Sequence, residues 1–417
     1  MKICFFTENY YKGGVDTFLI NLINFWPDDK DEITLVCNST HPGLDTIENK
    51  TKRFFSIHRY HYLFTSQITS GQSKYSFFRT RAIVYFFKIL RRLLEYPILF
   101  PWYLISLTYF FQRSNYDHLM VINGGYPASL LCRTAAIAWN FAGKRPLAIF
   151  NFHNFVQKAH PLFTFIERMV DTLVYNSSSA IVSVSQSCLN SLSSRPVFKY
   201  PKLKYILNGI EDPIKIANQN TFNPEFNIEN CDYCLILATY EQRKGHPYLL
   251  TAFKEVIVKY PNLQLHIFGY GSPSEKKKVS DIRDALLLNK NVFLHNFTDQ
   301  TGPLIKNAKA LLVPSQSYES FGLTIIEAMA WGTPVVVTDV GGMPEVLKDS
   351  GAGFVCSRDN PLEFASRIKE IIESPSLAAE LSRNGRRTFE KKFTARRMAA
   401  EYHLLVKKSK CVESNEE

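Results

Sequence analysis

Several features that would place this chain of 417 residues in other protein classes are missing. Its eight cysteines are scattered, and its one C-x-x-C pair, Cys231 and Cys234, has no second cysteine or histidine pair to complete a zinc site. That pair enters an apolar strand, so we interpret it as structural. The apolar run at residues 3–6 is too short for a secretion signal, and Glu8 follows it. We therefore expect a reduced, cytosolic chain without a metal site.

Acidic residues are absent between Glu48 and Glu95. Residues 1–211 carry 23 Lys and Arg against 13 Asp and Glu, whereas residues 212–417 carry 26 against 25, so the net charge of +11 lies almost entirely in the N-terminal half. A basic block of this kind favours an anionic partner, and anionic lipid, nucleic acid and a charged glycan all qualify. The ten basic residues of the block are Lys50, Lys52, Arg53, Arg59, Lys74, Arg79, Arg81, Lys88, Arg91 and Arg92.

Charged side chains are also missing from Tyr96 to Gln112. A membrane-spanning helix needs about 20 apolar residues. This run is shorter, and Pro97 and Pro101 lie near its start. Three interpretations of residues 75–112 remain open: a buried core helix, a basic and aromatic surface that docks on a membrane, and a transmembrane span.

Short apolar runs of strand length alternate with helical patterns along the whole chain, and the length suits two domains. Three helical patterns follow Phe354, and the last covers residues 394–407. This order predicts an α/β protein. The strands that we expect are residues 2–7, 32–37, 118–123, 147–152, 180–185 and 204–207 in the first half, and 234–240, 263–268, 292–297, 310–313 and a run from Val335 in the second.

The most informative stretch runs from Pro314 to Glu345 and predicts a strand, a loop, a helix and a second strand. In open parallel sheets, ligands bind at the carboxyl ends of the strands, against the helix N-termini. Backbone N–H groups at Phe321, Gly322 and Leu323 would be unpaired donors at the positive end of the helix, which suits a diphosphate. Gly322 would let an anion approach the backbone closely.

Two glutamates, Glu319 and Glu327, bracket that helix start with seven residues between them. A carboxylate accepts hydrogen bonds from sugar hydroxyls, so one glutamate for a hexose and one for a ribose would suit a nucleotide-sugar. The spacing alone is equally compatible with two solvated glutamates on a surface helix.

The combined pattern carries a resemblance to a known family. Glu319-Ser-Phe-Gly-Leu-Thr-Ile-Ile-Glu327, then Ala-Met-Ala-Trp-Gly-Thr-Pro-Val-Val and Gly341-Gly342-Met-Pro-Glu345, closely resembles the donor-site signature of family 4 retaining glycosyltransferases. That family has the GT-B fold, in which two Rossmann-like doubly wound domains face each other across a cleft. The resemblance implies an acceptor-binding domain at residues 1–211, a linker at 212–230, a nucleotide-sugar-binding domain at 231–393, and a C-terminal helix at 394–417 that could cross back to the first domain.

The resemblance also assigns roles to single residues. Gly14 lies in the Gly-rich loop after the first strand, His153 matches the cleft histidine, and Lys244 of a Lys-Gly pair would grip the donor diphosphate. The family's arginine position holds Thr239, and two interpretations of Arg243, next to Lys244, stay open: it takes over that charge, or it is an exposed side chain. The residues expected to be catalytic are His153, Lys244 and Glu319, and those expected to bind the donor are Gly14, Asn208, Arg243, Lys244, Phe321, Gly322, Leu323 and Glu327.

The resemblance implies a metal-independent retaining enzyme that moves a hexose from a nucleotide diphosphate sugar to a glycan or polyprenyl-linked lipid acceptor. We expect no separate cofactor and no nucleic-acid partner. The expected pathway class is the assembly of cell-surface polysaccharide or lipopolysaccharide, on the inner face of the cytoplasmic membrane. The alternatives are a sugar-nucleotide isomerase or phosphorylase on the same fold, and a non-catalytic protein that binds carbohydrate or membrane.

One further motif lies near the start of the chain. Asp29-Lys30-Asp31 resembles the metal-binding D-x-D of the other main glycosyltransferase fold. It lies in a polar loop before a strand, not at a strand's carboxyl end, so we interpret it as solvated surface.

Overall fold

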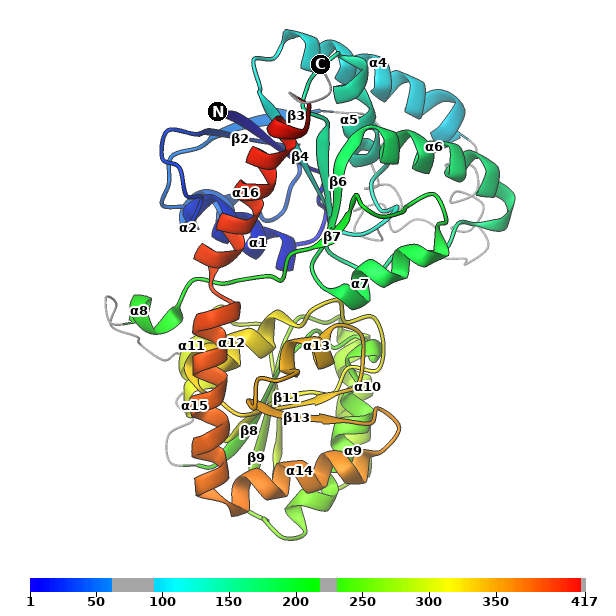
Figure 1. Cartoon of the computed structure of the whole chain (residues 1–417). Coiled ribbons are helices and arrows are strands. Elements are labelled where there is room, and N and C mark those ends of the chain that lie inside the picture. The colour runs from blue at the N-terminus through cyan, green and yellow to red at the C-terminus, as the bar shows by residue number, and fades with distance from the viewer. Residues whose placement is uncertain (62–93, 218–230, 414–417) are drawn as a thin grey trace. The chain divides into compact units, whose positions relative to one another are not determined.

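The structure is a computed structural model that describes residues 1–61, 94–217 and 231–413 (Figure 1). Six residues of the basic block (Lys74, Arg79, Arg81, Lys88, Arg91 and Arg92) lie outside the described residues, as do most of the predicted linker and the end of the chain. The chain divides into two compact units, Met1–Ile206 with Arg396–Glu417, and Leu207–Ala395.

The N-terminal unit is built on a parallel sheet of seven strands in the order β3-β2-β1-β4-β5-β6-β7. In register, Ile3 lies between Ile33 and His118, and the central strands are buried on both faces, as parallel strands covered by helices require. The strands are β1 (Lys2–Thr7), β2 (Glu32–Asn38), β3 (Ser56–Tyr60), β4 (His118–Asn123), β5 (Ala148–Phe152), β6 (Ser178–Ser183) and β7 (Leu203–Tyr205).

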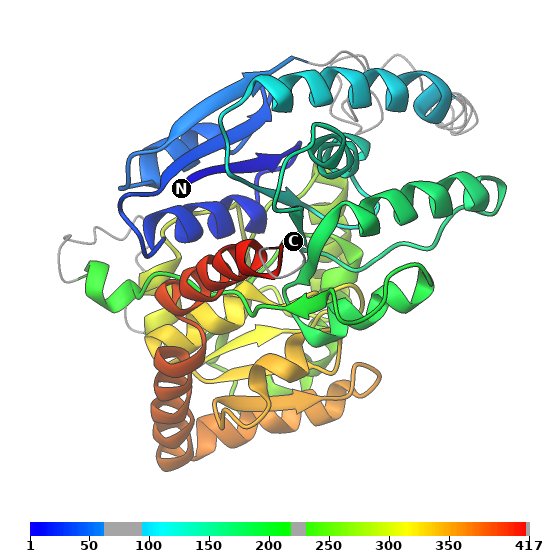
Figure 2. The ribbon, with the colours of Figure 1, turned by 45° about the horizontal axis from the view of Figure 1, so that its top comes forward.

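The last helix of the chain, α16 (Ala395–Glu413), packs into the core of this N-terminal unit beside the first helix, α1 (Gly14–Asn24) (Figure 2). The rings of Phe18 and Tyr402 meet edge to face, with centroids 5.4 Å apart. The other helices of the unit are α2 (Leu44–Lys50), α4 (Phe100–Arg113), α5 (Leu130–Phe141), α6 (Thr164–Asn176) and α7 (Gln186–Asn190), with short turns η2 (Glu95–Leu99), η3 (Pro161–Phe163) and η4 (Ser191–Ser194).

The second unit has a parallel sheet of six strands in the order β10-β9-β8-β11-β12-β13. The strands are β8 (Tyr233–Leu237), β9 (Gln264–Phe268), β10 (Val292–His295), β11 (Ala310–Val313), β12 (Val335–Thr338) and β13 (Gly353–Cys356). The helices are α8 (Pro213–Ala217), η5 (Gln242–Lys244), α9 (His246–Ile257), α10 (Pro273–Ala285), α11 (Thr301–Asn307), α12 (Leu323–Trp331), α13 (Met343–Leu347), α14 (Pro361–Glu373) and α15 (Pro375–Lys392).

Both sheets start at a central strand, wind outward to one edge, and return to build the other half. This is the doubly wound, Rossmann-like order, so the predicted fold class is confirmed. The predicted bounds of the strands at 2–7, 118–123 and 310–313 are reproduced. The edge strands β3 and β13 were not predicted, and the strand expected at 234–240 already ends at Leu237.

Helix α4, in the uncharged run, has two different faces. One face packs into the protein through Phe100, Tyr103, Leu107 and Phe111, as the core-helix interpretation predicts. The other face leaves large apolar side chains in water, and Ile105 is 72% exposed. Among the helices of the described ranges, none has both the length and the apolar content that crossing a membrane requires.

We predict that Tyr402→Phe destabilises the N-terminal unit. The Asn151 Nδ2 group donates a 2.7 Å hydrogen bond to the Tyr402 hydroxyl, both residues are fully buried, and the other acceptor of that amide, the carbonyl of Val182, lies at 3.4 Å. Leaving a buried donor poorly paired costs about 1–3 kcal/mol. The measurement is the free energy of unfolding in urea.

The matched control is Leu404→Ala, because Leu404 lies on the same helix with a half-exposed side chain. Equal stability of Tyr402→Phe and wild type would show that the bond between Asn151 and Tyr402 does not hold α16 in place.

Candidate functional site

The candidate site lies where the strand order of the second sheet reverses. Strands β8 and β11 are neighbours in the sheet but far apart in the sequence, so the loops that follow them meet at the same carboxyl edge. Ligands of doubly wound sheets bind at this switch point. The two loops are joined through the backbone, because the N–H of Gln316 donates to the carbonyl of Arg243 at 2.8 Å.

A glycine sets how closely these loops approach. Gly245 ends the turn after β8 with φ of 76°, and a Cβ atom there would lie 1.9 Å from the carbonyl oxygen of Pro314. Any other residue would be strained in that conformation and would also push the second loop away. The Lys-Gly pair in the sequence therefore has a structural reason for its glycine as well as a chemical reason for its lysine.

The contact between the loops places Lys244 against Glu319. The Nζ atom of Lys244 lies 2.6 Å from Oε2 of Glu319, and the two side chains are 16% and 15% exposed. The hydroxyl of Ser315 lies 3.5 Å from the same carboxylate oxygen, and the N–H of Gly342 donates to the Glu319 carbonyl at 2.9 Å. A sheltered cation and anion are thus held side by side, ready to face a ligand that carries both phosphate and hydroxyl groups.

Helix α12 begins beside this pair without a side-chain cap. Its N-cap is Gly322, which has φ of 85°, and Leu323 is its first residue. The first N–H groups of a helix have no acceptor within the helix, and the helix dipole makes this end positive. The side chain of Phe321 is buried and its ring lies 6.1 Å from that of Phe393, so it anchors the loop. The arrangement suits a bound anion.

Glu327 lies further along α12 in a different environment. Its side chain is half-buried, and burial raises the pKa of its carboxyl group from 4.5 to about 7. Among the residues that the structure describes, no ion pair compensates that burial in the way that Lys244 compensates Glu319. The two glutamates therefore differ in electrostatic state although they belong to one motif.

The contacts of Arg243 bear on whether it can replace the arginine that the family has at the position of Thr239. The guanidinium of Arg243 binds the carboxylate of Glu241 at 2.5 Å and lies 3.5 Å from the carbonyl of Tyr318. At the family's arginine position, the Thr239 hydroxyl is buried without a hydrogen-bond partner among the described residues, and its carbonyl lies 2.9 Å from Nε2 of His246. The role of Arg243 as a substitute stays a prediction, because its charge is taken up by Glu241 here.

Gly14 and His153 belong to the N-terminal unit. Gly14 begins α1, and the neighbouring N–H of Gly13 is already used, since it donates to the buried carboxylate of Asp16 at 2.9 Å. The ring of His153 lies against Phe18 of α1, with centroids 4.4 Å apart. Burial lowers the pKa of His153 to about 3, so its imidazole is neutral, and its Nε2 atom has no hydrogen-bond partner among the described residues.

Asn208, the last of the expected site residues, lies buried in the second unit. The adjacent Gly209 packs on the chain just before α16, where a Cβ atom would lie 2.3 Å from the carbonyl oxygen of Thr394. Asn208 is therefore placed where two segments of the chain cross, and its position is explained by packing.

Sequence reasoning missed two features of the second unit. Ser315, beside Glu319, is fully buried, and its carbonyl accepts a hydrogen bond from the Thr338 hydroxyl at the end of β12. Tyr270 and Phe297 stack at 4.1 Å where β9 and β10 end, yet they are 52% and 44% exposed. The signal was present, since Phe297 ends one predicted strand and Tyr270 comes two residues after another.

Comparison with known proteins finds a family model that matches part of the chain. Residues 218–388 match the family model described as glycosyl transferases group 1. An uncharacterized glycosyltransferase of Methanocaldococcus jannaschii is 28% identical over 49% of this chain and 60% of its own length. The capsular polysaccharide biosynthesis glycosyltransferase CapM of Staphylococcus aureus is 23% identical over 66% of this chain and 73% of its own length. The chain spans about half to three fifths of the first two curated relatives that it matches (60% and 51%).

Solved structures extend the likeness to the whole chain. The Anabaena protein HepE, solved in complex with UDP, has a TM-score of 0.71 at 18% identity, with 98% of this chain and 100% of that chain covered. At this identity the likeness shows the fold, which is GT-B. The predicted resemblance to glycosyltransferases is confirmed, while membership of family 4 in particular stays a prediction.

We predict a pH-dependent effect of Glu327→Gln on stability. The pKa of Glu327 is raised in the folded state, so between about pH 4.5 and 7 the folded protein binds more protons than the unfolded chain. This carboxyl group therefore lowers the free energy of unfolding as the pH rises through that window, and its cost is complete above it. Glu327→Gln should remove the cost, so the variant should gain stability over wild type toward alkaline pH.

The measurement is urea unfolding of both proteins at several pH values across the window. The control is Glu255→Gln on the exposed face of α9. A difference in stability between Glu327→Gln and wild type that does not change with pH would contradict the raised pKa.

Proposed function

We propose that the chain is a retaining glycosyltransferase that transfers a hexose from a nucleoside diphosphate sugar to a glycan or lipid-linked acceptor during the assembly of a cell-surface polysaccharide. The observation that carries the proposal is the pair of Lys244 and Glu319, held at the carboxyl ends of β8 and β11 beside the uncapped start of α12. Phosphate, sugar hydroxyl and helix N-terminus have complementary partners there.

The chemistry follows from the charges. When the bond between sugar and diphosphate breaks, negative charge develops on the leaving diphosphate. Lys244 and the first N–H groups of α12 are fixed donors for that charge, and preorganised donors of this kind lower the energy of the transition state. The carboxylate of Glu319 accepts a hydrogen bond from a sugar hydroxyl. Glu327, further along α12, accepts one from a hydroxyl of the ribose.

The relatives support this substrate class. The Anabaena protein HepE has been solved with UDP-glucose as well as with UDP. A poly(ribitol-phosphate) alpha-N-acetylglucosaminyltransferase of Staphylococcus aureus is 31% identical over 35% of this chain. Together with CapM, these names concern glycosyl transfer onto surface polymers. A nucleotide-sugar donor and a polymer or lipid-linked acceptor are consistent with them.

We predict that Glu319→Ala and Lys244→Ala damage donor use in different ways. Loss of a hydrogen bond to a charged group costs about 1.5–3 kcal/mol, so Glu319→Ala should weaken donor binding or turnover by about tenfold or more. Lys244→Ala should lower kcat more than it raises KM if its charge acts mainly in the transition state. The measurements are donor binding by calorimetry and nucleotide release with and without acceptor.

The control is Glu255→Ala, which removes an exposed carboxylate from α9 in the same unit. Kinetics equal to those of wild type in both site variants would contradict the assignment of Lys244 and Glu319 to the donor site. Nucleotide release that never depends on an added acceptor would instead favour an isomerase or a binding protein on the same fold.

We further propose that the N-terminal unit docks on an anionic membrane surface, which is where a lipid-linked acceptor resides. Four large apolar side chains on η2 and α4 recur at helical spacing and face water: Ile98, Trp102, Ile105 and Tyr109, which are 57%, 43%, 72% and 53% exposed. A surface of this length and composition is suited to lie in the interface of a bilayer.

The basic block adds an electrostatic part, but not through all of its members. Arg53 donates to backbone carbonyls of the protein itself, and Arg59 pairs with Glu48 at 3.0 Å. A lysine or arginine near an anionic surface contributes about 1 kcal/mol at low salt. Insertion of apolar side chains adds a contribution to the binding free energy that salt does not weaken.

We predict that the protein sediments with anionic vesicles and is released in part by high salt. The double variant Trp102→Gln, Ile105→Gln should abolish the salt-resistant part, because it removes two exposed apolar side chains without changing charge. The matched control is Val258→Gln in the second unit, where the side chain is 79% exposed. Equal binding to neutral and anionic vesicles would refute the electrostatic part, and unchanged salt-resistant binding by the double variant would refute the role of α4.

A further inference from the structure

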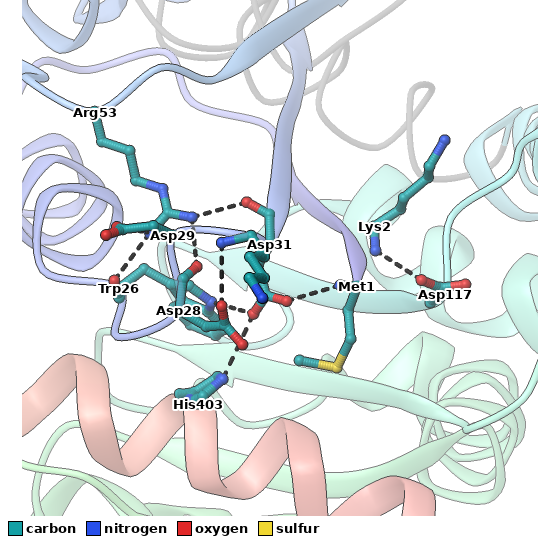
Figure 3. Close-up of polar contacts among 10 residues, drawn as sticks. Met1, Lys2, Trp26, Asp28, Asp29, Asp31, Arg53, Asp117 and His403 are labelled. Carbon is teal, nitrogen blue, oxygen red and sulfur yellow. Dashed lines mark hydrogen bonds and ion pairs between the residues drawn. The ribbon is translucent and has the colours of Figure 1, made fainter.

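The loop between α1 and β2 and the C-terminal helix form a polar cluster that the proposed reaction does not use (Figure 3). Its members are Asp28 and Asp31 from the loop and His403 from α16. The cluster lies where β1 and β2 begin, whereas Gly14 lies at the opposite, carboxyl edge of the same sheet.

The structure corrects the interpretation of the D-x-D motif as solvated surface. The side chain of Asp29 is fully exposed, as expected, but Asp31 is buried, with 5% of its surface exposed. Burial of a carboxylate requires compensating donors. Asp31 therefore has partners that the local sequence could not reveal.

The contacts of Asp31 use both of its oxygens. The Met1 amino group lies 2.7 Å from Oδ1, and the indole N–H of Trp26 donates to Oδ2 at 2.8 Å. Nε2 of His403 faces the same Oδ2 atom at 3.5 Å, which is too long for a strong hydrogen bond. The loop itself is held by Arg53, whose guanidinium donates to the carbonyls of Trp26, Asp28 and Asp31 at 2.9, 2.6 and 2.8 Å.

The imidazole of His403 is the informative member. It is 8% exposed, and its Nε2 atom has no hydrogen bond to any of the described residues. One ligand atom each from Asp28, Asp31 and His403 lies within 4.8 Å of the others. A buried ring nitrogen without a hydrogen bond that lies close to two carboxylates is the arrangement in which a shared cation would supply the missing contact.

We propose that Asp28, Asp31 and His403 bind a divalent transition-metal ion, with Zn²⁺ as the fitting representative. Two carboxylate oxygens and one imidazole nitrogen, without a thiolate, are a donor set that such ions accept. Metal-bound carboxylates in proteins are usually hydrogen-bonded from behind, and the Trp26 indole does this for Asp31. Asp28 is half-exposed, so it can close onto the ion, and water can complete the coordination.

The position of the cluster makes the ion a structural one. It would join the loop before β2 to α16, segments near opposite ends of the chain, and it lies at the sheet edge away from Gly14. A ligand that binds only the folded arrangement stabilises it, so the ion would fasten α16 to the N-terminal unit.

The test uses the full chain freed of metal by a chelator. Zn²⁺ binding is measured by calorimetry, and Co²⁺ binding by visible absorption. Wild type should bind one equivalent of Zn²⁺ at this cluster, and Asp28→Asn and His403→Gln should each lower the affinity by about tenfold or more. Asp29→Asn is the matched control, because it removes the exposed neighbouring carboxylate and should leave the affinity unchanged. Asp31 is left intact because it also holds Met1 and Trp26.

A second readout is the midpoint of thermal unfolding, which Zn²⁺ should raise in wild type and in Asp29→Asn but not in the two ligand variants. Binding of equal strength in wild type, Asp28→Asn and His403→Gln would overturn the proposal, because the ion would then sit elsewhere. Absence of saturable Zn²⁺ and Co²⁺ binding by folded wild type would overturn it as well.

Discussion

The close approach of two loops at Gly245 is the constraint on which the candidate site depends. The carbonyl of Pro314 occupies the space that a side chain at position 245 would need, so the loops after β8 and β11 meet backbone to backbone. Lys244 directly precedes Gly245, and Glu319 lies in the loop that follows Pro314, so the contact brings their side chains within 2.6 Å of each other. The sheet supplies the neighbouring strands, but the missing side chain sets the spacing at which the ion pair can form.

A second long-range constraint operates in the N-terminal unit. Helix α16 contributes Tyr402 to the hydrogen bond with Asn151 of the central sheet, and on the next residue it presents His403 to Asp31. One turn of helix therefore contacts both the sheet interior and the loop before β2. Loss of α16 would expose apolar core and leave two polar groups without their partners, which explains why the last helix of the chain is buried so thoroughly.

The sequence predicted what depends on local pattern and missed what depends on distant partners. Buried central strands such as β4 and β11 are continuous apolar runs, so their bounds were predicted correctly. Edge strand β3 is mostly exposed or half-buried and has no such run. The motif supplied Lys244 and Glu319 as residue types, but their pairing depends on two segments about 75 positions apart. The burial of Asp31 depends on Met1 and His403, which no local rule connects to it.

The two glutamates of the motif show why spacing alone could not decide between a site and a solvated surface. Glu319 pairs with Lys244 at 2.6 Å, whereas burial raises the pKa of Glu327 to about 7. A diphosphate that approached two ionised carboxylates would be repelled by both. Here one carboxylate is paired with a lysine, and burial favours the neutral form of the other. In the proposed function, this lets a diphosphate approach while both carboxyl groups still offer oxygen acceptors to sugar hydroxyls, which two solvated glutamates on a surface helix would not achieve.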